Sequence, residues 1–202
     1  MSVRRAHSRG FSFSEISAVL AIVGLMSAMS LPALSRFANN ASFRGACNEV
    51  AHLLVMARDR AILKGQETAL RWVASGGDLV FTMYEDGNKN GVLADDIRRG
   101  VDKPVYGPFS LRGKYPGIAF AFVAGFAAPD PSGNPIGNLG DPVRLGNSNM
   151  CSFSPFGKAS PGTIYVSNGA TRQAAVRITP ASGRIQVLEW TGPTTKWVRR
   201  YW

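Results

Sequence analysis

An uncharged apolar stretch near the amino terminus constrains the fold of this chain more than any other feature. Residues 16–34 contain no charged side chain, and the ten residues before Phe11 include Arg4, Arg5 and Arg9. A helix of about 20 apolar residues matches the thickness of the hydrocarbon layer of a bilayer. Because the arginines precede this stretch, we expect residues 1–10 to stay in the cytoplasm and the rest of the chain to face outward.

The order of features around the apolar stretch differs from that of a secretory signal peptide, which has its cleavage site after the apolar run. Here Gly10 and Phe11 precede the run, Glu15 stands at its start, and Pro32 follows 21 residues after Phe11. These residues resemble the processing region of type IV prepilins. The resemblance implies that a prepilin peptidase cleaves after Gly10 and that the new amino-terminal residue, Phe11, is methylated.

Glu15 and Pro32 are the residues of this segment that we connect with assembly. A carboxylate beside lipid is costly, and it therefore indicates a function. The resemblance implies that Glu15 pairs with the Phe11 amine of a neighbouring subunit; the alternative is a carboxylate solvated by lipid headgroups. Proline at position 32 removes one backbone hydrogen bond, and we expect it to bend or loosen the helix there.

A second helical pattern follows the apolar stretch. Between residues 42 and 64, apolar side chains recur at alternating steps of four and three, which places them on one stripe of an amphipathic helix. These residues are Phe43, Cys47, Val50, Leu54, Ala57 and Ala61. Gly65 is expected to end the helix. His52 falls opposite the stripe, so we expect it to face solvent or a neighbouring subunit.

Short β-rich runs separated by glycine and proline dominate the chain after Gly65. We predict strands at residues 68–73, 78–84, 105–111, 118–123, 163–167, 174–179, 184–190 and 196–201. An Ala-Ser-Gly-Gly sequence joins the first two runs as a hairpin. The expected fold class is α+β: a long amino-terminal helix, membrane-spanning in its first half, packed on a small head of antiparallel sheet.

Three short motifs of the head resemble those of the FimT/GspH group of type IV pilin-like proteins. They are ARDRAILKGQ at residues 57–66, FSPFG at residues 153–157 and SGRI at residues 182–185. The resemblance implies three parts: a leader at residues 1–10, a membrane and filament-core helix at residues 11–39, and a head at residues 40–202. It also implies a minor pilin or pseudopilin held in the bacterial inner membrane with its head in the periplasm, before assembly with other pilins. Type IV pilus and type II secretion pseudopilus both remain open, as does a position at the tip or in the shaft.

The basic composition suggests an alternative function, DNA binding for natural transformation. The formal net charge is +10, which favours anionic partners. Near the carboxy terminus, aromatic residues alternate with the basic residues Arg184, Lys196, Arg199 and Arg200, a mixture suited to phosphates and bases. Some FimT-like DNA receptors resemble one another in a Gly-Arg-x-Arg motif; this chain has Gln186 in place of the second arginine. A half-buried edge strand would give the same alternation.

Two further sets of residues allow more than one interpretation. Asp86, Asn88 and Asn90 resemble the start of a calcium loop, but the glutamate at its twelfth position is missing, and turn residues explain the same letters. Cys47 and Cys151 either form a disulfide in an oxidising compartment or remain two buried thiols.

The sequence favours a structural role over an enzymatic one. The mature chain would have one histidine and carries no HExxH, GxSxG or phosphate-loop pattern. We therefore predict neither enzyme activity nor a cofactor other than the calcium considered for residues 86–90.

Overall fold

The computed structural model describes residues 12–190 and 196–200, and within the first helix it leaves out the side chains at positions 29–33, 35 and 36. Helix α1 (Phe13–Lys64, 52 residues) runs without a break through Pro32, so the helix does not melt at this proline. Contacts within the chain divide it into two units, with the division after Ala41. Among the described residues, no helix has the length and apolar character required to cross a membrane.

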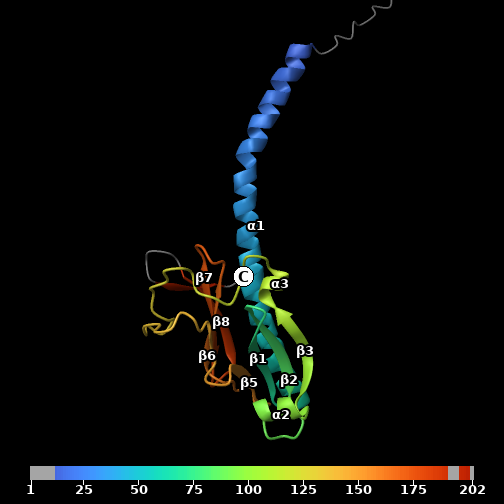
Figure 1. The fold of residues 1–202 in the computed structure, drawn as a ribbon, viewed down its shortest axis with the longest axis vertical. Helices are drawn as coiled ribbons and strands as arrows, with labels where there is room; N and C mark the ends of the chain where they lie inside the picture. The colour runs from blue at the N-terminus through green and yellow to red at the C-terminus, as the bar shows by residue number, and fades with distance from the viewer. Residues whose placement is uncertain (1–11, 191–195, 201–202) are drawn as a thin grey trace, which may run out of the picture. The chain divides into compact units, whose positions relative to one another are not determined.

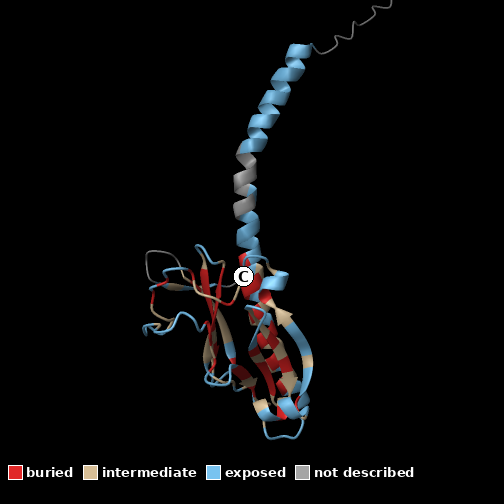
Figure 2. Cartoon of the chain, viewed as in Figure 1, coloured by how far each residue is buried: buried red, intermediate tan, exposed pale blue. Residues whose placement is uncertain are grey.

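The part of α1 that belongs to the head follows the predicted stripe. All six residues predicted for the stripe are buried, whereas His52 is exposed as expected. Figure 2 shows buried residues along the part of α1 that belongs to the head. The helix ends at Lys64, and Gly65 follows with a φ of 64°, the left-handed conformation that glycine adopts readily. The period of the apolar residues therefore predicted both the helix and the face that it buries.

The first sheet contains four antiparallel strands in the order β3-β2-β1-β5 (Figure 1). The strands are β1 (Thr68–Ser75), β2 (Asp78–Glu85), β3 (Lys103–Ser110) and β5 (Met150–Phe153). Gly76 and Gly77 form the two-residue turn between β1 and β2, with φ values of 58° and 78°. Positive φ at both positions matches the twist of a hairpin, so the predicted hairpin is confirmed.

The second sheet contains five antiparallel strands in the order β4-β6-β7-β8-β9. The strands are β4 (Val143–Arg144), β6 (Gly162–Ser167), β7 (Gln173–Thr179), β8 (Arg184–Trp190) and β9 (Trp197–Arg200). In Figure 1 the two sheets lie on either side of the carboxy-terminal part of α1. Their inner faces and the buried stripe of α1 form one hydrophobic core. The α+β class with antiparallel sheet is therefore confirmed for the head.

The strand predicted at residues 118–123 is wrong. This segment forms a single β-bridge, between Ala119 and Ser167. Beyond the bridge, the buried side chain of Gln173 takes the place of a partner strand. Its amide nitrogen donates to the carbonyl oxygen of Ala121 at 3.1 Å, and its Oε1 accepts the N–H of Val123 at 2.8 Å. The backbone is thus satisfied by a side chain, because buried polar groups need partners but not a regular ladder.

Two short helices were not predicted. Helix α2 (Ala94–Arg99) follows the turn after β2, and helix α3 (Leu111–Lys114) follows β3. The Ser110 hydroxyl caps α3 by accepting the N–H of Gly113 at 2.9 Å. Both helices are too short to show a period in the sequence.

Candidate functional site

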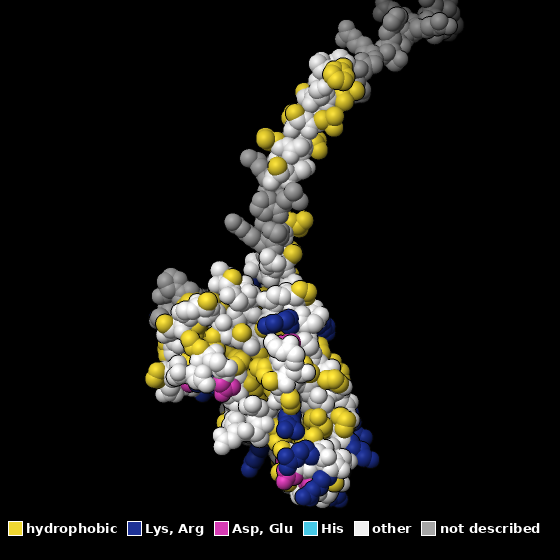
Figure 3. All heavy atoms as spheres, viewed as in Figure 1, with side chains coloured by type: hydrophobic (Ala, Val, Ile, Leu, Met, Phe, Trp, Pro, Cys, Tyr) yellow, Lys and Arg dark blue, Asp and Glu magenta, His cyan; other side chains and the backbone are white. Residues whose placement is uncertain are grey.

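The first part of α1 exposes large apolar side chains around its circumference. Figure 3 shows hydrophobic side chains along this stretch. Those exposed between positions 13 and 37 are Phe13, Ile16, Val19, Leu20, Ile22, Val23, Leu25, Met26, Leu34 and Phe37. Exposed apolar surface of this extent marks a site for lipid or for another protein.

Glu15 takes part in a capping box at the start of α1. Its Oε2 accepts the backbone N–H of Ser12 at 2.8 Å, and its own N–H donates to the Ser12 hydroxyl at 3.3 Å. This reciprocal pair satisfies two donors that the first turn of a helix leaves open. Gly10 and Phe11, the predicted processing and methylation residues, lie outside the described residues, as does the side chain of Pro32.

The three motifs that resemble the FimT/GspH group meet at one point of the head. The Arg58 guanidinium, from the first motif, donates to the carbonyl oxygen of Gly183 at 3.5 Å. A Cβ atom on Gly183 would lie 2.4 Å from the carbonyl oxygen of Gly157 and 3.0 Å from Cδ of Arg58. The end of α1, the turn after β5 and the turn before β8 are therefore joined where only glycine fits. We call Arg58, Gly157 and Gly183 the motif junction.

Strand register places the candidate DNA contacts on two different faces of the second sheet. Ile185 and Val187 of β8 pack against the core, so Arg184 lies on the opposite, outward face, because side chains alternate along a strand. Arg199 pairs in register with Leu188, and therefore shares that outward face.

Two further arginines, Arg177 and Arg144, share the same face. Arg177 of β7 stands opposite Gln186 and Thr163, and Arg144 of β4 stands opposite Thr163. Arg144 lies in a two-residue strand that no sequence pattern indicated. We call Arg144, Arg177, Arg184 and Arg199 the arginine face.

Arg200 lies on the other side of the sheet. It pairs in register with Val187, and its Nε lies 3.0 Å from Oε2 of Glu189. Arg172 forms a second ion pair with Glu189 and stacks over the Phe43 ring at 4.7 Å. Glu189 is buried, and the two arginines compensate its charge. Arg200 therefore has a structural role in the head. Lys196 is exposed and directly precedes β9.

Trp190 and Trp197, the aromatic residues near the carboxy terminus that the structure describes, belong to the packing of the head. Trp197 donates its indole N–H to the carbonyl oxygen of Pro129 at 2.8 Å and lies 6.0 Å from the Phe126 ring. Trp190 contacts Phe126 edge-on at 5.2 Å. Burial raises the pKa of the neighbouring Tyr165 to about 12. Register places Trp190 and Trp197 on the same face of the sheet as Arg184, where both are half-buried and pack with Phe126 rather than forming an open base-stacking surface.

The candidate calcium residues form a turn held by hydrogen bonds. Asp86 is buried, and its Oδ1 accepts the N–H of Asn88 at 3.0 Å, while its Oδ2 accepts that of Gly91 at 2.9 Å. The side chains of Asn88 and Asn90 donate to Asp96, and those hydrogen bonds lower the pKa of its carboxyl group. Within the described residues, no group of three histidine, cysteine or acidic side chains could hold a metal ion. The turn interpretation explains these residues.

Cys47 and Cys151 are both buried and both free in the structure. No disulfide joins them, so the structure has the two thiols of the alternative interpretation. Burial raises the pKa of both thiols, that of Cys151 to about 12. A thiol that stays protonated is a poor nucleophile, so we assign both cysteines to the core.

The fold places the chain in a class of proteins in which an amino-terminal helix packs on two antiparallel sheets. A family model described as type II transport protein GspH matches residues 46–183, which is more than half of the chain. The chain therefore belongs to the GspH family, a family of pseudopilins and minor pilins. The match begins after the prepilin-like segment at residues 10–34. The family match and the resemblance to type IV prepilins therefore rest on different residues. Neither a curated protein nor a solved structure matches the chain.

Proposed function

We propose that this protein is a structural minor pilin or pseudopilin, processed after Gly10 and assembled through α1 into an envelope filament. Residues 1–10 would be the leader, residues 11–39 the membrane and filament-core helix, and residues 40–202 the periplasmic head. Membership of the GspH family favours a type II secretion pseudopilus, with other pseudopilins as partners. No enzymatic step enters this function.

The observation that carries the proposal is the exposed apolar surface of the first part of α1. Its large side chains are open to solvent, and Phe13 is 87% and Phe37 71% exposed. Fully burying one such side chain is worth about 1.5–3 kcal/mol. The hydrocarbon layer of a bilayer and the equivalent apolar helices of neighbouring subunits would both bury these side chains. The same surface therefore suits an inner-membrane anchor before assembly and a helical filament core afterwards.

Glu15 supplies the specific contact within that apolar surface. One carboxylate oxygen is used by the capping box, and no donor among the described residues contacts Oε1. The amine of Phe11 in a neighbouring subunit would pair with this oxygen and remove both charges from an apolar environment. Opposite charges attract strongly where the effective dielectric constant is low.

Two substitutions separate the charge of Glu15 from its capping role. Glu15→Gln keeps a capping side chain but removes the charge, whereas Ser12→Ala removes the cap and keeps the charge. The proposal expects Glu15→Gln and Glu15→Ala to reduce incorporation into sheared filaments at least tenfold. Ser12→Ala should assemble at close to the parental level, in cells that express the other filament subunits. Normal assembly of Glu15→Gln would refute the charge-pair mechanism.

A second candidate function is DNA binding, and the arginine face is the observation that favours it. No carboxylate among the described residues forms an ion pair with Arg144, Arg177 or Arg184. They lie on one face of β4, β7 and β8 and so offer several cations to one nucleic-acid backbone, and each phosphate contact contributes to salt-dependent affinity. Arg200 is not part of this candidate surface, because it is paired with Glu189.

The test of this second function compares two variants. Replacing Arg177, Arg184 and Arg199 together by alanine should weaken duplex DNA binding. It should also reduce the slope of the logarithm of the binding constant against the logarithm of the salt concentration by about three in magnitude. Arg200→Ala should leave the slope unchanged. Fluorescence anisotropy at several salt concentrations measures both. Equal binding by the triple variant and the parent would leave only the structural role.

A further inference from the structure

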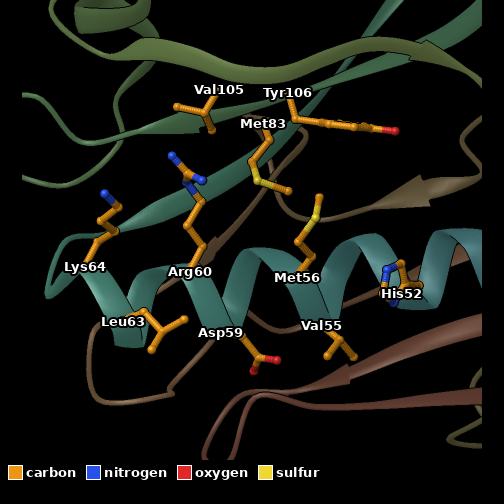
Figure 4. A pocket seen from close by; sticks show the side chains of 10 residues that line it. All are labelled: His52, Val55, Met56, Asp59, Arg60, Leu63, Lys64, Met83, Val105 and Tyr106. Atoms are coloured by element: carbon orange, nitrogen blue, oxygen red, sulfur yellow. The ribbon is translucent and has the colours of Figure 1, made fainter.

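The head contains an open groove on the face of α1 that is turned toward β2 and β3. Its volume is about 500 Å³. Figure 4 shows the helix forming one wall, from His52 to Lys64, and strand residues Met83, Val105 and Tyr106 forming the other. The groove belongs entirely to the head and lies apart from the arginine face.

The walls of the groove are mainly apolar. His52, Met56, Arg60 and Lys64 recur every four residues and so lie along one side of α1. The side chain of Met56 points toward that of Met83 (Figure 4), which is buried in the core on which the half-buried Met56 packs. Leu63, at the rim, is 85% exposed. Methionine side chains adapt to partners of different shape, which makes such a surface suitable for binding a peptide.

The charges of the groove are paired in its middle and unpaired at one end. Arg60 forms an ion pair with Glu85, and Asp59 lies 3.1 Å from the Arg58 guanidinium. Lys64 is exposed and has no ion-pair partner among the described residues. A ligand in this groove therefore meets an apolar surface that ends in a positive charge.

We propose that this groove binds an extended, acidic and apolar segment of a different protein, with a carboxylate beside Lys64. The helix wall rises ~18 Å between positions 52 and 64. Five or six extended residues span about the same length. Charge complementarity favours a foreign, acidic segment over a second copy, because the chain carries a net charge of +10.

The edge strand β3 determines how this segment is held. Pro104 and Pro108 lie in β3, and proline has no N–H to donate. A partner strand therefore cannot form a continuous ladder along β3. The segment is held by its side chains, with apolar groups against Met56, Val105 and the exposed ring of Tyr106.

The test uses the full-length chain in nonionic detergent and two fluorescein-labelled hexapeptides, Leu-Phe-Ile-Val-Asp-Glu and Leu-Phe-Ile-Val-Lys-Lys. Anisotropy is measured against a blank of detergent and peptide alone. The acidic peptide should bind at least tenfold more tightly than the basic one. Lys64→Glu should weaken its binding about fivefold, because reversing an exposed charge replaces attraction by repulsion. Arg112→Glu, a charge reversal on α3, is the matched control and should change nothing.

A second pair of variants tests the apolar wall. Val105→Asp places a carboxylate in the groove and should abolish binding, whereas Val73→Asp, on β1 of the same sheet, should not. Lys64 is exposed, so its variant tests the proposal even where Val105→Asp fails to fold. Equal binding of the two peptides, binding of neither, or equal effects of Lys64→Glu and Arg112→Glu would overturn the proposal. Dimers that form without peptide and dissociate in Val105→Asp would assign the groove to a second copy and would also overturn it.

Discussion

Replacing Gly183 by alanine is expected to be among the most destabilising single-methyl changes in the head. Gly183 has a φ of 57°, and alanine in this left-handed region costs about 1–2 kcal/mol. The added Cβ would also lie 2.4 Å from the carbonyl oxygen of Gly157, so the turn after β5 or the end of α1 must shift. Overpacking of this kind costs about 1–3 kcal/mol. Together the two effects predict a loss of roughly 3 kcal/mol.

Gly169→Ala is the matched control, since Gly169 lies in the turn between β6 and β7. Its φ is 74°, but no atom lies within 4 Å of an added Cβ, so only the conformational cost of about 1–2 kcal/mol applies. In a domain of this size, 1 kcal/mol shifts Tm by about 2–4 °C. Thermal unfolding followed by circular dichroism should thus show a loss in Tm of roughly 6–12 °C for Gly183→Ala and a smaller loss of about 2–8 °C for Gly169→Ala. Equal losses would refute the reasoning that the motif junction is closely packed.

Three further outcomes follow from the head. Neither Cys47 nor Cys151 should react with iodoacetamide at pH 8 in the folded protein, because burial raises the pKa of both thiols. Both should react in denaturant without reductant. Failure of the two thiols to react in denaturant would indicate a disulfide. Burial raises the pKa of Tyr165 to about 12, above its usual value near 10. Its stabilisation is therefore complete below about pH 10 and lost as the pH rises toward 12, so urea unfolding of Tyr165→Phe should show a smaller alkaline loss than that of the parent. Trp197→Phe removes the hydrogen bond to Pro129 and should lower the free energy of unfolding by ~1 kcal/mol, measured by urea unfolding; no change would show that the bond is not a net stabiliser.

The sequence predicted best where a period or a turn residue decides the structure. The stripe from Phe43 to Ala61 gave the buried face of α1, and Gly76 with Gly77 gave the first hairpin. The strand prediction for residues 118–123 failed because the apolar residues of this segment are buried without a ladder of hydrogen bonds to a neighbouring strand. The buried side chain of Gln173 satisfies its backbone, and no local pattern marks a glutamine for that role.

The arginine face and the groove beside α1 could not be predicted from the sequence either. Arg184 and Arg200 are close in the sequence, but alternation and register place them on opposite faces of the second sheet. Arg144 joins the arginine face through a pairing of β4 with β6 that spans about 20 residues of sequence. The groove beside α1 depends on β2 and β3 together with the helix. Contacts of this kind depend on tertiary pairing and leave no periodic signal.

The amino terminus of the mature protein tests the central claim most directly. The chain should be purified from envelope membranes of cells that contain a prepilin peptidase, and its intact mass and amino-terminal sequence determined. A filament subunit of the proposed kind begins at a methylated Phe11. A membrane-bound chain that still begins at Met1, in cells whose other prepilins are cleaved, would contradict the account.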